Sequence, residues 1–221
     1  WRYYTAEAFD LFYPGYGDSW PSFTGAIGMT YEQAGHGRSG IAIERRDGHV
    51  LTLAERIAHH DLASMATIAT AASNRADLLA DYARFRASAI EEGRGGAIRE
   101  FILAPGDDPD RTARLVDLLL LQGIEVRRAS AEFTVSSAVD FQGQKGEQRF
   151  AAGTFLVSLA QPLKRLAKTL LEPKTEIKEL YFYDVSAWSL PYAFGVEAYW
   201  SPQAIEVNLF SAGLYIVSDL R

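Results

Sequence analysis

Cysteine is absent from all 221 residues. Its absence excludes disulfide bonds, thiolate zinc ligands and every mechanism that uses a cysteine nucleophile. Long apolar runs are also missing, because no stretch approaches the roughly 20 apolar residues of a membrane-spanning helix. The net charge of −6 has the wrong sign to attract nucleic acid through an overall field. We therefore expect neither a membrane span nor a nucleic-acid partner.

Nucleotide-binding motifs are missing as well. Neither half has a Gly-x-Gly-x-x-Gly turn after a strand-like run, and no P-loop sequence is present. The chain is 48% apolar, enough for a core, at a length that suits one large domain or two small ones. It begins WRYYTAEAFD, with neither an initiator methionine nor a basic and apolar leader. We expect it to be a piece of a longer protein.

The first half opens with a loop and short strands. Residues 1–25 are rich in aromatic residues, proline and glycine, which favours an ordered loop over a regular element. Two apolar runs, 26–32 and 40–45, are predicted as strands, and the Asp47-Gly48 pair predicts a turn. The glycine-rich stretch QAGHGRSG, residues 33–40, separates the two runs.

A long helix should follow from Thr52. Thr52 and Glu55 match the S/T-x-x-E capping box that starts a helix. Helical composition continues to the glycines of EEGRGG, residues 91–96, where we place the boundary of a first domain over residues 1–93. The apolar positions recur at helical spacing and predict an amphipathic stripe: Leu53, Ile57, Leu62, Met65, Ile68 and Ala72.

The second domain, residues 97–221, is predicted to be α/β. Residues 97–105 and 124–130 read as strands around a helix that Asp108 caps, Pro109 opens and Gly123 closes. Such a βαβ unit predicts a mainly parallel sheet. Farther on, we expect two strands joined by a polar glycine turn, and a short helix closed by proline: residues 139–159 and 161–173. The fold class of the whole chain is therefore α/β.

Glu32 is the first candidate for chemistry. It ends the predicted strand 26–32 and precedes a glycine-rich turn, which can present a carboxylate to a cleft. Partial burial there would raise the pKa of the carboxylate toward that of a useful general base. The alternative from the residues alone is an exposed acid near a turn.

The segment MTYEQAGHGRSG resembles the one that carries the catalytic glutamate of the zinc carboxypeptidase family, the carboxypeptidase A-like metallopeptidases. In that family a strand ends in the glutamate and a Gly-Arg-x-Gly turn follows, as Gly37-Arg38-Ser39-Gly40 does here. FYPGYGDSWP is similar to the family's tyrosine-bearing loop, and the helix from Thr52 matches its closing helix in position. The resemblance covers about residues 1–74, the C-terminal part of a carboxypeptidase-like α/β domain.

The resemblance implies roles for five residues and a peptide substrate. Glu32 matches the general base and acid that takes a proton from a metal-bound water and passes it to the leaving amine. Tyr13 matches the mobile phenol that contacts the substrate's terminus, with Tyr16 as the competing choice because the loop is short. Asp18 matches the acid of the specificity pocket, and Arg38 lies in the turn after the glutamate.

The zinc ligands of this family have no counterpart in this sequence. The family binds zinc through a His-x-x-Glu pair and a later histidine, all before the catalytic glutamate, and this sequence has no His-x-x-Glu. All four histidines follow Glu32: His36, His49, His59 and His60. We expect zinc in the full-length parent protein, no cofactor in this chain, and no hydrolysis by this chain alone. Glu55 and His59 form a permissible metal pair on one helix face, but a solvated face is the alternative and the sequence nominates no further ligand.

The second half resembles, more weakly, the domain that follows the peptidase part in large bacterial carboxypeptidase-like proteins, which is similar to class I glutamine amidotransferases. That chemistry needs a cysteine with histidine behind it, and the second half has neither. A packing or ligand-binding module remains. The late aromatic residues suit either a core or a peptide or sugar platform: Trp188, Tyr192, Phe194, Tyr199 and Trp200.

Three functional hypotheses follow from the sequence. The first is a piece of a zinc carboxypeptidase-like hydrolase with an accessory domain. The second is a non-catalytic peptide- or ligand-binding module that keeps the peptidase scaffold, and the third is a pair of structural domains in a larger assembly. An isolated piece of a catalytic domain would expose apolar surface, so we also expect self-association.

Overall fold

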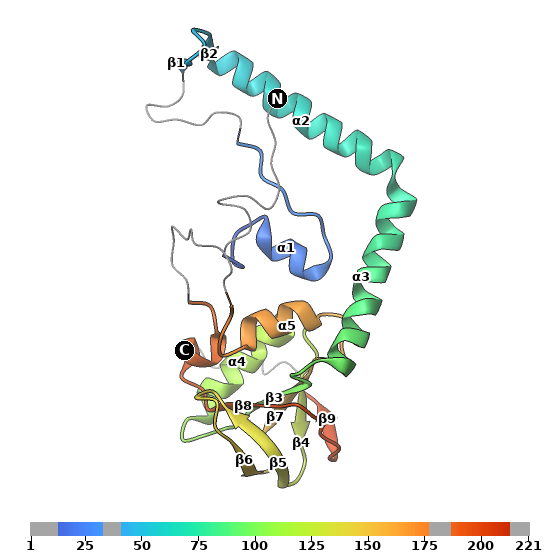
Figure 1. The fold of residues 1–221 in the computed structure, drawn as a ribbon, viewed down its shortest axis with the longest axis vertical. Helices are drawn as coiled ribbons and strands as arrows, with labels where there is room; N and C mark the ends of the chain where they lie inside the picture. The colour runs from blue at the N-terminus through green and yellow to red at the C-terminus, as the bar shows by residue number, and fades with distance from the viewer. Residues whose placement is uncertain (1–12, 33–40, 177–186, 213–221) are drawn as a thin grey trace, which may run out of the picture.

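The computed structural model describes residues 13–32, 41–176 and 187–212. Its helical part comes first along the chain: α1 (Ser19–Thr24), β1 (Ala42–Glu44), β2 (Val50–Thr52), α2 (Leu53–Ser73) and α3 (Arg75–Gly95). A sheet domain follows: β3 (Glu100–Leu103), α4 (Pro109–Leu121), β4 (Arg127–Ala129), β5 (Phe133–Asp140), β6 (Lys145–Phe150), β7 (Phe155–Ser158), α5 (Lys164–Leu171), α6 (Leu190–Phe194), β8 (Ala198–Ser201) and β9 (Leu209–Ser211). Helices α2 and α3 form a long bent arm that rises from this domain (Figure 1). The α/β class predicted from the sequence is confirmed.

A hairpin and a capping box start α2. β1 and β2 pair antiparallel, and Gly48 takes a φ of +79° in the predicted Asp-Gly turn between them. At the helix start, the Thr52 hydroxyl accepts from the Glu55 amide at 3.3 Å, and the Glu55 carboxylate accepts from the Thr52 amide at 2.8 Å. The bonds from Thr52 lower the pKa of Glu55, and the nearby His49 adds to this effect. Both sequence predictions are confirmed.

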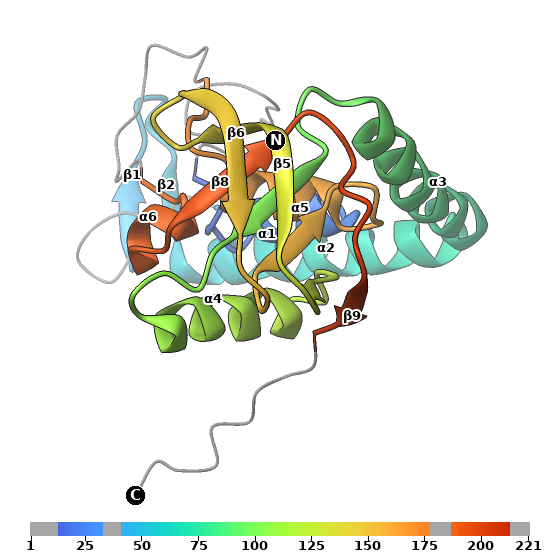
Figure 2. The same cartoon turned by 90° about the horizontal axis from the view of Figure 1, so that it is seen from below.

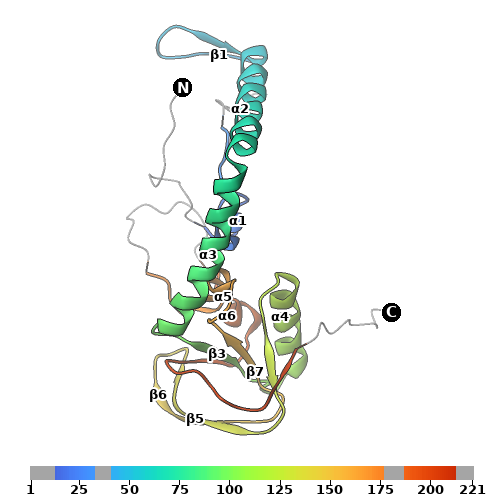
Figure 3. The same cartoon turned by 90° about the vertical axis from the view of Figure 1, so that its right-hand side faces the viewer.

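The predicted long helix is divided at Asn74. α2 and α3 each have 21 residues, and Asn74 between them has φ −108° and ψ 18°, outside the helical region. Its side-chain amide donates to the Thr70 carbonyl at 2.8 Å. Asparagine competes in this way with the backbone for hydrogen bonds, which lets the chain bend. Figure 3 shows the two helices of the arm from the side.

The strand predicted over residues 26–32 is not formed. This segment has no strand pairing in the described structure and runs as a connection after α1. A strand requires a hydrogen-bonded neighbour, which an apolar run cannot specify by itself. The second predicted strand is confirmed as β1.

The mainly parallel sheet predicted for the second half is wrong. The described strands lie in the order β6-β5-β8-β3-β7-β4-β9, and every neighbouring pair is antiparallel. β3 and β4 do point the same way around α4, as a βαβ unit requires, but β7 lies between them. Local periodicity predicted the unit correctly and could not predict that a later strand would enter it.

Two apolar clusters cover the two faces of the sheet. α4 and α5 pack on one face, where Phe101 and Leu103 of β3 meet Leu115 and Leu166, all fully buried. On the other face, Ile102 of β3 packs with residues of β5, β6 and the stretch before β9. Alternate residues of β3 therefore enter opposite cores, as strand geometry requires. Figure 2 views the sheet domain from below.

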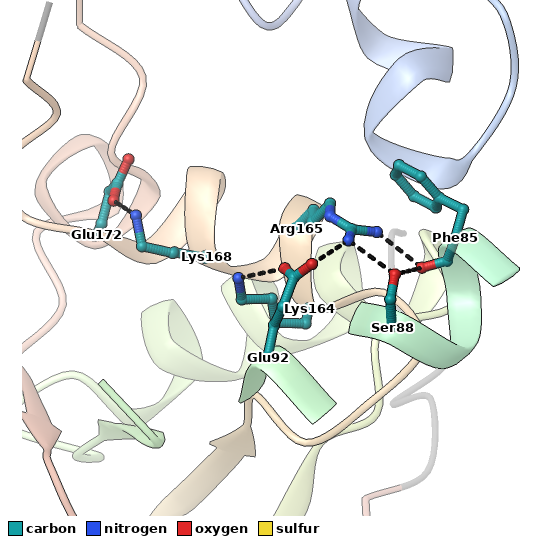
Figure 4. Close-up of polar contacts among 7 residues, drawn as sticks. All are labelled: Phe85, Ser88, Glu92, Lys164, Arg165, Lys168 and Glu172. Carbon is teal, nitrogen blue, oxygen red and sulfur yellow. Dashed lines mark hydrogen bonds and ion pairs between the residues drawn. The ribbon is translucent and has the colours of Figure 1, made fainter. Parts of the chain in front are cut away.

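The arm joins the sheet domain at a tight junction between α3 and α5 (Figure 4). Arg165 donates to the Phe85 carbonyl at 2.7 Å and to the Ser88 hydroxyl at 3.0 Å, and it lies 4.0 Å from the centre of the Phe85 ring. Glu92 is paired with Arg165 and also with Lys164, at 3.0 Å. We call these five side chains the α3–α5 clasp.

Gly93 lies against the backbone of the sheet domain, directly beside the clasp. A Cβ atom added to Gly93 would be 1.8 Å from the Leu159 carbonyl oxygen, so no other residue fits. We predict that Gly93→Ala lowers the free energy of unfolding by about 1–3 kcal/mol or more, as overpacking does. The control is Gly95→Ala. A Cβ atom added to Gly95 would meet no other atom within 4 Å, so this substitution should be neutral or raise the free energy of unfolding by up to about 1 kcal/mol. Urea unfolding measures both, and equal stability of the two variants would contradict the tight junction.

The clasp also predicts a pH effect on stability. The hydrogen bond from Lys164, followed by that from Arg165, holds the pKa of Glu92 below its usual value of 4.5. A carboxyl with a lowered folded-state pKa stabilises the protein above its unfolded-state pKa, and this stability is lost as pH falls through the folded-state pKa. Thermal unfolding of Glu92→Gln between pH 6 and pH 3, an acid range of about three units, should therefore show a weaker decline than wild type. An identical decline in both proteins would rule out this contribution.

Candidate functional site

The loop that carries Tyr13, Tyr16 and Asp18 is an ordered turn before α1. The Tyr16 amide donates to the Tyr13 carbonyl at 3.2 Å, and the Trp20 amide donates to the Tyr16 carbonyl at 2.9 Å. The two tyrosine rings lie edge to face with centroids 5.3 Å apart. Residues 13–18 form turns, as predicted. The prediction of a loop through residue 25 is wrong from Ser19 on, because Ser19–Thr24 form the helix α1, which Gly25 ends with a φ of +101°.

Asp18 joins this loop to the segment that leads to Glu32. Its carboxylate accepts a hydrogen bond from the Thr30 hydroxyl at 2.6 Å. Gly28 packs so closely that an added Cβ would lie 1.7 Å from the Asp18 carbonyl oxygen. Two stretches predicted to serve one site, the tyrosine loop and the glutamate segment, are therefore in direct contact. The sequence contained no pairing signal for Thr30 or Gly28, so these contacts were missed.

Glu32 is held near α2 but exposed. Its neighbour Tyr31 makes a hydroxyl contact with Thr67 of α2, which fixes the segment against the arm. Glu32 itself is exposed, and the described residues do not provide the partial burial that a general base at this position requires. In the described structure Glu32 corresponds to the exposed acid that was the alternative.

The remaining sequence candidates are dispersed or lie outside the described part. Arg38 and His36 fall outside the described residues. The Glu55 carboxylate is occupied by Thr52 and by His49, which lies 2.9 Å away. Within residues 13–32, 41–176 and 187–212, no group of three or more histidine, aspartate and glutamate side chains could hold a metal ion. No helix among them has the length and apolar character needed to cross a membrane.

The late aromatic residues do not form one cluster. Phe194 and Trp200 pack against the core on the helix-covered face of the sheet, and Tyr199 packs on the opposite face. Burial, and then a hydrogen bond to the Glu197 carboxylate, raises the pKa of Tyr199 to about 12. Tyr192 is 53% exposed, and its hydroxyl donates to the Phe141 carbonyl at 2.8 Å.

Trp188 joins the tyrosine loop instead. Its ring lies 6.2 Å from the Tyr13 ring at an angle of 57°. The residue comes from the second half of the chain, just before α6. No local pattern in the sequence could have placed Trp188 beside Tyr13, because the two residues lie at opposite ends of the chain.

A broad groove of about 540 Å³ lies beside β4, lined by Arg127 and residues 205–209. Arg127 donates to the Glu100 carboxylate at 3.1 Å, and the Glu100 side chain is only 2% exposed. Burial raises the pKa of Glu100, against the opposing effect of Arg127. The buried Glu100 carboxylate is thus paired with an arginine whose side chain is 37% exposed in the groove, so this ion pair explains the polar lining of the groove without a ligand.

The apolar stripe predicted on α2 faces solvent. Its large members, Leu53, Ile57, Leu62, Met65 and Ile68, are between 45% and 62% exposed. The covered side of α2 is polar, with a buried Arg56 and with Thr67 in contact with Tyr31. Soluble monomers rarely expose apolar surfaces of this extent, so this side of α2 is expected to bind another surface.

We predict that Ile68→Glu weakens self-association of the chain. Ile68 is 62% exposed, so its replacement should change the free energy of unfolding by no more than about 0.5 kcal/mol. The matched control is Leu121→Glu on α4, where the side chain is 68% exposed outside this stripe. Sedimentation equilibrium across a range of concentrations measures the effect. A wild-type chain that stays monomeric, or equal weakening in both variants, would contradict a role for the α2 stripe.

Comparison with protein-family models finds no match, and the same holds for curated proteins and for solved structures.

Proposed function

We propose that this chain is part of a zinc-dependent carboxypeptidase-like hydrolase and is inactive alone because the zinc ligands lie outside these 221 residues. The observation that carries the proposal is the Asp18–Thr30 hydrogen bond of 2.6 Å. It joins the tyrosine loop to the segment that ends at Glu32, which a shared site for a base and its substrate-binding groups requires. The type of reaction, peptide hydrolysis, is inferred from the sequence resemblance.

The residues of the chain have the following roles in this proposal. Glu32 accepts a proton from the attacking water and passes it to the leaving amine, the two tasks of one general base and acid. Tyr13 contacts the terminus of a peptide substrate, with Tyr16 as the competing phenol. Asp18 and Arg38 contribute to substrate binding around the reacting bond.

The described residues do not form a zinc-binding site. They contain no group of three or more side chains that could bind a metal ion. The exposed α2 stripe supports the proposal that another part of the full-length protein packs on α2. A helix of a folded protein normally packs its apolar side against a core, whereas α2 exposes that side and buries Arg56.

A non-catalytic peptide-binding module is the second candidate. The exposure of Glu32 favours it, because this chain presents the scaffold without a buried base. The second half fits either function as a packing or ligand-binding module, since it lacks both cysteine and histidine.

The test is Glu32→Gln in a longer polypeptide that contains this sequence and the zinc-binding part. We predict loss of peptide hydrolysis with unchanged metal content, because the amide keeps the shape of the side chain and cannot accept the proton. Glu44→Gln is the matched control, since Glu44 is also an exposed glutamate of the helical part. Hydrolysis of an acyl-dipeptide and metal analysis give the two readouts.

The outcomes of this experiment distinguish the hydrolase from the non-catalytic binding module. Retained turnover in Glu32→Gln would remove Glu32 from the mechanism. If the longer polypeptide binds peptide without cleaving it, the binding module is favoured. The 221-residue chain should bind no zinc in calorimetric titration and cleave no peptide, and turnover by this chain would contradict the proposal.

A further inference from the structure

The bend of the arm lies in a stretch that has no tertiary packing. Residues 68–77 are all exposed, whereas Thr67 of α2 and Leu78 of α3, which flank this stretch, are half-buried. Ten helical residues rise about 15 Å, so a whole section of the arm stands free of the rest of the described structure. Figure 1 shows α2 and α3 meeting at an angle within this section.

The hydrogen bonds of Asn74 end α2 without fixing the direction of α3. The side-chain amide and the backbone N–H of Asn74 both donate to the Thr70 carbonyl, at 2.8 and 3.0 Å. Asparagine is a favoured cap for the helix that follows it, yet Asn74 makes no side-chain hydrogen bond to the start of α3. α3 therefore begins from the backbone alone, where the Leu78 amide donates to the Asn74 carbonyl at 3.0 Å.

The two helices are anchored to different parts of the chain. The clasp fixes α3 to the sheet domain, and Arg86 of α3 donates to the Thr24 carbonyl at 3.4 Å. α2 is attached by the Thr67 hydroxyl, which contacts the Tyr31 hydroxyl, and by its first amide, from Leu53, which donates to the carbonyl of residue 41 at 2.8 Å. The anchors of α2 thus lie on the segment that ends at Glu32 and on the hairpin, and not on the sheet domain.

We propose that Asn74 is a hinge about which α2 turns relative to α3 and the sheet domain. Hinges concentrate at a few element-terminal residues that absorb a change of backbone angle, and Asn74 is such a residue between two helices of 21 residues. The bend has a local cause in the hydrogen bonds of Asn74, whereas the angle of the bend has no packing to fix it. The inference goes beyond the proposed function, because a hinge in the arm does not depend on what the chain binds or cleaves.

The hinge moves one part of the candidate site relative to another. Tyr31 is in contact with Thr67 on the moving helix, whereas Thr30, the residue before it, is bonded to Asp18 of the tyrosine loop. Glu32 follows Tyr31 directly and so turns with α2. The distance between Glu32 and Asp18 therefore depends on the hinge angle.

Pairs of spin labels on the 221-residue chain test the hinge by pulsed EPR distance measurement, and the chain has no native cysteine that would take up label elsewhere. One pair, Ala58→Cys with Ala87→Cys, uses exposed positions on the two sides of Asn74. A continuous helix would separate these positions by about 44 Å, at 1.5 Å per residue. We expect a broad distribution at shorter distances. A second pair within α2, Ala58→Cys with Ala72→Cys, gives the width of a rigid helix.

Substitutions in the arm should change the distribution in opposite directions. Asn74→Ala should narrow it and move it toward the continuous-helix distance, because alanine favours helix and has no side chain that competes for the Thr70 carbonyl. Ser73→Ala is the matched control, since Ser73 is the exposed neighbour of Asn74, and it should leave the distribution unchanged. Thr67→Val should broaden the distribution, because it removes the hydroxyl that contacts Tyr31.

Three results would contradict these expectations. A wild-type distribution across Asn74 as narrow as that of the pair within α2 would overturn the hinge, and so would a distribution that Asn74→Ala leaves unchanged. An unchanged width in Thr67→Val would overturn the coupling of α2 to the Glu32 segment. Circular dichroism of each labelled variant shows whether the helices are retained, so a loss of folding is not mistaken for motion at the hinge.

Discussion

The junction between α3 and α5 is the constraint on which the rest of the arrangement depends. Gly93 allows the α3 backbone to approach the Leu159 carbonyl, and Arg165 then reaches the Phe85 carbonyl, the Ser88 hydroxyl and the Glu92 carboxylate. Charged hydrogen bonds and a cation over an aromatic face are stronger than neutral contacts, because the positive guanidinium attracts the acceptor oxygens and the negative face of the ring. A glycine and an arginine thus hold a long helical arm on a small sheet domain.

The junction also determines the geometry of the candidate site. Since α1 contacts α5 and lies beside α3, the loop before it is oriented by the sheet domain and the arm (Figure 1). The segment after α1 returns to Asp18 through Thr30 and Gly28 and then reaches α2 through Tyr31. The tyrosine loop therefore contacts both the glutamate segment, through Asp18, and Trp188, through Tyr13, although these residues come from distant stretches of the chain.

The arm exposes the apolar side of α2. An isolated helix gains most of its stability from packing of its apolar side, yet α2 covers Arg56 and Thr67 and exposes Ile57, Met65 and Ile68. Such a distribution is costly in water and is relieved when another surface covers the stripe. The stripe is therefore apolar surface that no other described residue of the chain covers.

Sequence by itself determined the local features: the capping box of Thr52 and Glu55, the Asp-Gly hairpin turn, the Asp108 cap of α4 and the buried strand β3. These follow from short-range hydrogen bonding and periodicity, which involve residues a few positions apart. Tertiary structure alone decided the insertion of β7 between β3 and β4, the exposure of the α2 stripe and the contact between Tyr13 and Trp188. The physical reason is that strand partners, burial and cross-chain contacts depend on which surfaces meet in space, and no periodic pattern within one segment encodes its partner.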